Sequence, residues 1–306
     1  MVTSLPPASG FGFQIRSSET LRFARSGGGV ETLDVVLAPA RRERPATAPL
    51  ADWTLAGIDQ DARGALYQLD REFEFWASDV GAYRIAPDMS RVEIPEGPDA
   101  IVREQRLWGI PAALCFMQRG DVPLHAAAVE VEGRAVVLAA PRRRGKTTLA
   151  LAFHERGYRV LSEDLACCRP TGEPALLPGP ALLRLRPDVY GGRPPAGTHL
   201  VAARRDRIYL GLDEQRAGSG APVPIAAIVL LHESADEIAI TPIPAAEAIP
   251  SLWALSFRLP TVDGCAQAFR RLTWLASPLA IWDLYRPARL SCLEATVQRI
   301  VEVCRR

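Results

Sequence analysis

The segment 135–155 constrains the fold most strongly, because it joins three local patterns in a fixed order. An apolar run over 135–139 comes first, a loop over 140–145 follows, and a helical pattern over 146–155 stops at Gly157. A buried strand that leads through a short loop into a helix is typical of α/β proteins. We therefore predict an α/β fold for this chain.

The loop and the start of the helix fit the pattern of a phosphate-binding loop, once alanine is accepted at the first position. Successive N–H groups of such a loop bind anionic oxygens, helped by the positive end of the following helix. Gly145 lets the backbone approach the phosphates, Lys146 reaches their β and γ oxygens, and Thr147 offers a hydroxyl ligand to Mg²⁺. The predicted nucleotide site comprises Ala140, Arg142, Arg143, Arg144, Gly145, Lys146, Thr147 and Thr148. An arginine-rich surface turn is the alternative.

Lys146 is the only lysine among 36 basic residues, and all the others are arginine. Arginine cannot replace the lysine of a phosphate-binding loop, because its planar fork is larger and favours bidentate geometry. The chain thus places its one lysine where the motif requires it. The arginines at 142–144 either lie on a solvated face or attract ATP or an acidic substrate through their local potential.

A second strand, predicted over 158–161, is followed by Glu163 and Asp164. A right-handed crossover would place it beside the loop strand, so that both strand ends face the same phosphates. One carboxylate can then hold Mg²⁺ while the other accepts the proton of an attacking hydroxyl. An ordinary acidic loop is the alternative. His125, just before the predicted strand 126–131, is either a structural histidine or a site residue that orients a carboxylate.

The N-terminal third of the chain has a different pattern from the rest. Short alternating segments, with turns or linkers between them, predict a small β-rich domain over residues 1–98. The segments lie at 31–37, 73–76 and 82–85, and the turns or linkers at 26–29, 41–49 and 87–88. The apolar spacing over 100–118 then predicts a helix that Pro111 kinks or splits. We expect a second domain over 99–306.

Two later segments carry further local signals. Residues 191–220 concentrate glycine, proline and arginine, which predicts a mobile loop that either orders over an acidic peptide or is solvated. Ser291 and Glu294 have the spacing of a capping box, so we expect a helix to begin there. Its apolar stripe would comprise Leu293, Val297, Ile300 and Val301.

Composition limits the class of protein. The net charge of +1 and the apolar content of 48% indicate a globular chain that does not bind nucleic acid through bulk positive charge. No apolar stretch approaches the roughly 18 residues of a membrane span, and the N-terminus lacks a secretory signal, so we expect a cytoplasmic protein without a membrane partner. The six cysteines show neither a CxxC pair nor zinc spacing, and we expect them to be reduced and mostly buried.

A set of segments between residues 124 and 164 resembles one family of kinases. They are Leu124-His125-Ala126-Ala127-Ala128-Val129, the turn at Glu132-Gly133, Ala135-Val136-Val137-Leu138, the loop through Thr148, and the segment 156–164. Together they look like the catalytic core of HPr serine kinase/phosphorylase and its related kinases. The resemblance implies an HPr kinase-like phosphate-loop domain over 99–306, akin to phosphoenolpyruvate carboxykinase, and is compatible with a homo-oligomer.

Site roles follow from the same resemblance. It implies that Lys146 binds the phosphates of ATP and that Thr147 and Glu163 hold Mg²⁺. It also implies that Asp164 is the general base on a serine hydroxyl and that His125 is the active-site histidine. The glycine-rich signature linked to HPr recognition and dephosphorylation is not found in the chain. We therefore expect a serine kinase of a peptide or protein, with a ribosomally synthesised precursor of the lasso type as one candidate substrate. A nucleotide-binding regulator or scaffold, and a different transfer chemistry on the same fold, are the alternatives.

Overall fold

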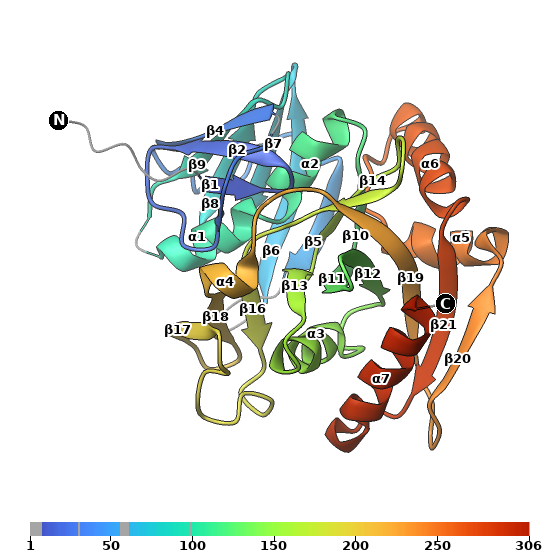
Figure 1. Cartoon of the computed structure of the whole chain (residues 1–306). Coiled ribbons are helices and arrows are strands. Elements are labelled where there is room, and N and C mark those ends of the chain that lie inside the picture. Colours follow the sequence, from blue (N-terminus) through green and yellow to red (C-terminus); the bar gives the residue numbers. More distant parts are fainter. Residues whose placement is uncertain (1–7, 30, 56–60, 98, 306) are drawn as a thin grey trace.

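Two large sheets and one small sheet organise the part of the chain that the structure describes (Figure 1). The structure is a computed structural model, and it describes residues 8–29, 31–55, 61–97 and 99–305. Helices cover the sheets, so the predicted α/β class is confirmed as a mixed α/β fold with several sheets. Pro98, at the predicted domain boundary, and residues 1–7 lie outside the described residues.

The first sheet is formed by the N-terminal strands, in the order β3-β1-β2-β4-β9-β8-β7-β6-β5. Their bounds are β1 (Ala8–Gly10), β2 (Phe13–Ser17), β3 (Arg25–Ser26), β4 (Glu31–Ala38), β5 (Ala51–Leu55), β6 (Ala62–Leu69), β7 (Glu72–Ala77), β8 (Gly81–Ile85) and β9 (Arg91–Pro95). Phe13 and Ile15 are buried on β2 while Gln14 and Arg16 are exposed, as a strand with one buried face requires. The predicted strands in β4, β7 and β8 are confirmed.

Two helices, α1 (Ala100–Leu107) and α2 (Ile110–Gln118), pack on this sheet. The predicted split of the helix is confirmed, and it falls at Gly109, which caps α2. Pro111 stands in the first turn of α2, where its missing N–H has no helical partner to lose.

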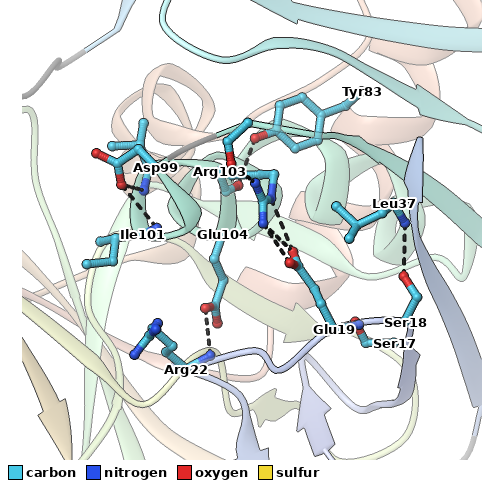
Figure 2. A network of polar contacts seen from close by, with 12 residues as sticks. Ser17, Ser18, Glu19, Arg22, Leu37, Tyr83, Asp99, Ile101, Arg103 and Glu104 are labelled. Carbon is cyan, nitrogen blue, oxygen red and sulfur yellow. Dashed lines mark hydrogen bonds and ion pairs between the residues drawn. The ribbon is translucent and has the colours of Figure 1, made fainter. Parts of the chain in front are cut away.

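A polar network fastens α1 to the N-terminal segment (Figure 2). Arg103 forms a bidentate ion pair with Glu19, with its shortest contact at 2.6 Å. Glu104 accepts hydrogen bonds from the backbone N–H groups of Arg22 at 2.6 Å and Phe23 at 2.7 Å. The N-terminal strands and α1 are therefore joined by buried polar contacts as well as by apolar packing.

The second sheet has the order β10-β14-β15-β19-β12-β11-β13, with β21 pairing to β19 and β20. Its strands are β10 (Val122–Leu124), β11 (Ala126–Val131), β12 (Arg134–Ala139), β13 (Arg159–Ser162), β14 (Ala166–Arg169), β15 (Ala175–Leu177), β19 (Val223–Glu233), β20 (Ala239–Ile243) and β21 (Ala280–Arg286). Strands β12, β19 and β21 are parallel, so their carboxyl ends meet at one edge.

Four helices enclose the centre of the second sheet. Alternate residues of β11 and β12 pack against α3 (Lys146–Glu155) and α7 (Leu293–Cys304) on one face. The other residues of the same strands face α5 (Ala245–Leu255) and α6 (Val262–Ala276). Because both faces are covered, these strands are almost wholly apolar.

The predicted neighbour of the loop strand is wrong. Strand β13 pairs with β11 in antiparallel fashion, and β11 lies between it and β12. The tight hairpin at Glu132-Gly133 places β11 beside β12, which leaves only the outer edge of β11 to β13. Strands β12 and β13 still run in the same direction, so their carboxyl ends lie at the same side of the sheet.

Two local predictions near the C-terminal half are also wrong. Residues 191–220 are not one mobile loop, because they contain β17 (Thr198–Ala203), β18 (Ile208–Leu212) and α4 (Glu214–Ala217). Strand β18 pairs with β17 and with β16 (Leu182–Leu185) in the small sheet, and its apolar run is buried. Because glycine and proline flank these strands, their apolar pattern is not evident from the local sequence.

The predicted capping box does not form. A 3₁₀ turn, η1 (Leu290–Cys292), includes Ser291, so α7 begins at Leu293 and Cys292 caps it without a side-chain hydrogen bond. The apolar stripe is confirmed for Val297, Ile300 and Val301, which are buried. Leu293 is half-buried at the rim of the same core.

Arg25 joins the first sheet to the second. Its side chain is buried and donates to the backbone carbonyl groups of Val160 and Leu161 at 2.9 Å, and to those of Gly179 and Ala217. Val160 and Leu161 belong to β13, the strand that leads to the acidic pair. The two-domain division stays a prediction, and Arg25 makes its contacts across the predicted boundary.

Two further predictions concern cysteines and membranes. All six cysteines are free, with Cys115, Cys167 and Cys168 buried and the other three partly buried, which agrees with the expected thiols. Among the residues described, no helix combines the length and apolar character that crossing a membrane would need.

Candidate functional site

The loop 140–145 leaves the end of β12 and turns into α3 at Gly145. Gly145 adopts φ 77°, a left-handed conformation, and any side chain there would meet the guanidinium of Arg286. Arg143 also has a positive φ, 64°. The predicted strand, loop and helix are thus confirmed as elements, and binding of phosphate by them stays a prediction. Since no side chain within the described chain caps α3, its first N–H groups are open to an outside acceptor.

Lys146 is buried at the start of α3 and points back under its own loop. Its Nζ donates to the carbonyl oxygens of Ala140 at 2.8 Å and Pro141 at 3.0 Å. The third partner is Nε2 of His125, at 2.9 Å. Burial lowers the pKa of the Lys146 ammonium to about 8. Sequence analysis predicted both residues, and the structure brings them into contact.

Thr147 and Glu163, the two predicted metal ligands, are in direct contact. The Thr147 hydroxyl donates to Oε1 of Glu163 at 2.6 Å. Glu163 follows β13 and is buried, and burial raises the pKa of its carboxyl. The start of α3 and the end of β13 therefore present a hydroxyl and a carboxylate to the same space.

Asp164 lies beside His125 and is half exposed. Nδ1 of His125 is 3.2 Å from the backbone carbonyl of Asp164 and 3.5 Å from its Oδ1. Burial acts to raise the pKa of Asp164, but the nearby charges of Arg184, His125 and Lys146 hold it well below the usual range. Burial lowers the pKa of His125, so the imidazole is neutral at pH 7.

Arg184 is the site residue that sequence analysis missed. It lies on β16, 17% exposed, with Nε 2.8 Å from Oε2 of Glu163 and Nη2 2.9 Å from Oδ2 of Asp164. The only local signal is an arginine inside the apolar strand run Leu182-Leu183-Arg184-Leu185. Its two partners are about twenty residues earlier in the chain and follow a strand of another sheet, so the pairing could not be predicted.

These contacts form a closed ring. From Lys146 the ring passes through His125, Asp164, Arg184 and Glu163 to Thr147, which is the next residue in the chain after Lys146. A pocket opens beside it, lined by Glu163, Asp164 and Arg184 together with Phe11, Gln105, Trp108, Gly109, Leu165, Pro180 and Leu182. The first sheet and α1 thus supply part of the wall next to Asp164.

The remaining predicted loop residues lie outside the ring. Arg142 and Arg143 are exposed at the tip of the loop, and Thr148 is half-buried in the first turn of α3. Arg144 forms an ion pair with Glu233 at the end of β19, and its carbonyl accepts a hydrogen bond from Nη2 of Arg286 at 3.1 Å. Arg144 therefore holds the loop to the neighbouring parallel strands.

The donor set fits a magnesium ion that also binds phosphate. Thr147 and Glu163 are oxygen donors, which Mg²⁺ prefers, and it usually takes one or two carboxylates with phosphates and water. Within the described ranges, no group of three or more His, Cys, Asp or Glu side chains could hold a metal ion. A magnesium ion here would thus need phosphate ligands as well.

No protein-family model matches the chain, and no curated protein matches it. Among solved structures, it is similar to the Hpr(Ser) kinase/phosphatase from Coxiella burnetii, with 11% sequence identity and a TM-score of 0.30. The match covers 58% of this chain and 95% of that one.

Proposed function

We propose that the chain is an ATP- and Mg²⁺-dependent kinase that transfers the γ-phosphate to a serine hydroxyl of a peptide or protein. One observation carries the proposal: the ring joins the start of α3 to the two carboxylates after β13. Lysine, hydroxyl and paired carboxylates are the side chains that phosphoryl transfer requires, and here His125 and Arg184 link them into one set of contacts.

The start of α3 would hold the nucleotide. The free N–H groups of its first turn and the Lys146 ammonium would bind the phosphates, and Thr147 and Glu163 would hold Mg²⁺. The metal would supply neutralising charge to the β- and γ-phosphates. Lys146 already has three acceptors in place, so phosphate oxygens would replace part of this set.

Asp164 would accept the proton of the serine hydroxyl. Its lowered pKa keeps the carboxylate ionised at neutral pH, and it is half exposed toward the pocket beside the ring. His125 would orient it, because neutral Nε2 accepts from Lys146 and Nδ1 then carries the proton that faces Asp164. Lys146 thus holds the imidazole of His125, and His125 in turn faces the general base.

The pocket beside Asp164 would receive the acceptor side chain. Its wall includes the buried residues Phe11 and Trp108 together with Asp164, so a serine in the pocket would lie near the proposed base. A serine of a ribosomally synthesised precursor peptide of the lasso type is one such acceptor.

Incubation with labelled ATP and serine-containing peptides tests the proposal. We expect Asp164→Asn to reduce the transfer rate by about 10²-fold or more, because general-base catalysis is lost. Asp188→Asn is the matched control, since Asp188 is 58% exposed and pairs with Arg186 outside the ring. Transfer that Asp164→Asn leaves unchanged would remove Asp164 as the base.

A nucleotide-binding regulator without transfer activity is the second candidate. The observation that favours it is Arg184, which already occupies both carboxylates of the pair. Calorimetry with ATP, combined with the transfer assay, separates the two. Binding without phosphoryl transfer to any peptide of the panel would support the regulator.

A further inference from the structure

The guanidinium of Arg184 lies between Glu163 and Asp164 and uses a different nitrogen for each carboxylate. A planar guanidinium can donate along two directions at once, whereas an ammonium is a compact point charge. The side chain is 17% exposed, and without nucleotide its two carboxylate partners hold it between them. Arg184 therefore bridges the pair rather than pairing loosely with either residue.

This bridge changes what Glu163 can offer to a cation. Both of its carboxylate oxygens have partners, because Thr147 donates to Oε1 and Arg184 to Oε2. The two carboxylates and the guanidinium of Arg184 together carry one net negative charge, whereas the carboxylates alone would carry two. A divalent ion that approaches Glu163 meets the positive charge of Arg184, whose Nε lies 2.8 Å from Oε2, and repulsion between charges is strong in a partly buried site.

We propose that Arg184 is a positioning residue that keeps divalent cations off Glu163 until nucleotide phosphates are bound. The inference rests on the proposed function, in which Glu163 is the Mg²⁺ ligand. Phosphate oxygens match the fork of a guanidinium as well as a carboxylate does, so Arg184 can turn from Glu163 toward them. Asp164 keeps its contact with His125 during this change.

The proposal and a purely structural role predict opposite effects on metal binding. If Arg184 only held the site together, its removal would disorder Glu163 and weaken any cation site. If Arg184 excludes cations, its removal leaves two adjacent carboxylates and a hydroxyl that attract them. The affinity of the nucleotide-free chain for a divalent cation decides between the two.

Titration of the nucleotide-free full chain with Mn²⁺, followed by electron paramagnetic resonance of the free ion, is the test. We expect Arg184→Met to raise the Mn²⁺ affinity at least about tenfold. Arg184→Lys keeps the charge but loses the fork, and should give a smaller rise. Arg186→Met is the matched control, because Arg186 is 63% exposed, pairs with Asp188 and should leave the affinity unchanged.

An unchanged or weaker Mn²⁺ affinity in folded Arg184→Met protein would overturn the proposal. A gain that persists after Glu163→Gln is added to Arg184→Met would overturn it too, since the cation would then bind elsewhere. If Arg184→Met does not fold by circular dichroism, Arg184→Gln replaces it with the same expectation, because glutamine retains a donor for Glu163. The measurement uses no nucleotide, so failure of the kinase proposal would show separately, as absence of transfer by the unmodified chain.

Discussion

The ammonium group of Lys146 lies 2.9 Å from Nε2 of His125. Because an ammonium can only donate, Nε2 must accept, and the imidazole proton is fixed on Nδ1. That proton faces Asp164, whose backbone oxygen is 3.2 Å away. Lys146, which is predicted to hold phosphate, thus also fixes the tautomer of His125. His125 in turn lies beside Asp164, the predicted base.

Lys146→Arg conserves charge but should abolish transfer. Under the loop, two carbonyl oxygens and one imidazole nitrogen surround the Lys146 ammonium at 2.8 to 3.0 Å. A planar guanidinium cannot satisfy this arrangement, and we expect a loss of about 10²–10³-fold or more in kcat/KM. Arg186→Lys, an exchange at an arginine that is 63% exposed and pairs with Asp188 outside the ring, is the control in the labelled-ATP assay. Full activity of Lys146→Arg would contradict the assigned site.

Nucleotide binding should take up protons at alkaline pH. Burial lowers the pKa of Lys146 to about 8, so the ligand-free side chain loses its charge above that value. Phosphate favours the charged form, and binding at pH 9 should therefore restore the proton, whereas binding at pH 7 should not. Calorimetry in two buffers of different ionisation enthalpy measures the uptake. Equal uptake at both pH values would contradict the shifted pKa.

Glu104→Gln should destabilise the chain, and more at acidic pH. The Glu104 carboxylate accepts from the N–H groups of Arg22 and Phe23 and from Nε1 of Trp108, and a glutamine amide turns a donor toward one of them. We expect a loss of about 1–3 kcal/mol in the free energy of unfolding at pH 7.

The pH dependence follows from the pKa of Glu104, which burial raises from 4.5 to about 6. A raised carboxyl pKa adds stability that is fully present below pH 4.5 and is lost as pH rises through 6. The difference between the unmodified chain and Glu104→Gln should thus grow by about 2 kcal/mol from pH 7 to pH 4.5. Urea unfolding measures it, with exposed Glu72→Gln as control. A constant difference would show that Glu104 has an ordinary pKa.

Arg25→Met should lower the free energy of unfolding by about 2–4 kcal/mol, because the four buried carbonyl groups lose their charged donor. Arg16→Met removes an arginine that is 69% exposed and pairs with Asp34, so it should change stability by less than about 1 kcal/mol. Urea unfolding of both variants makes the comparison. Equal effects would show that Arg25 is not a structural link.

Local patterns predicted the elements of the site better than their arrangement. The loop strand, the helix from Lys146 and the acidic pair depend on residues close together in the chain, and their periodicity is visible in the sequence. The place of β13 next to β11, and the pairing of Arg184 with Glu163, depend on strands that meet only after folding. The sequence predicts a loop over 191–220 because glycine and proline outnumber the short apolar run of β18.

The position of Arg25 also bears on how the chain folds as it is synthesised. Its four acceptor carbonyl groups come between 135 and 192 residues later in the sequence. A ribosome therefore releases most of the first sheet well before Ala217 emerges, and until then the guanidinium stays hydrated. The edge of that sheet at β3 can reach its final place only late, so completion of the N-terminal region waits for the C-terminal half.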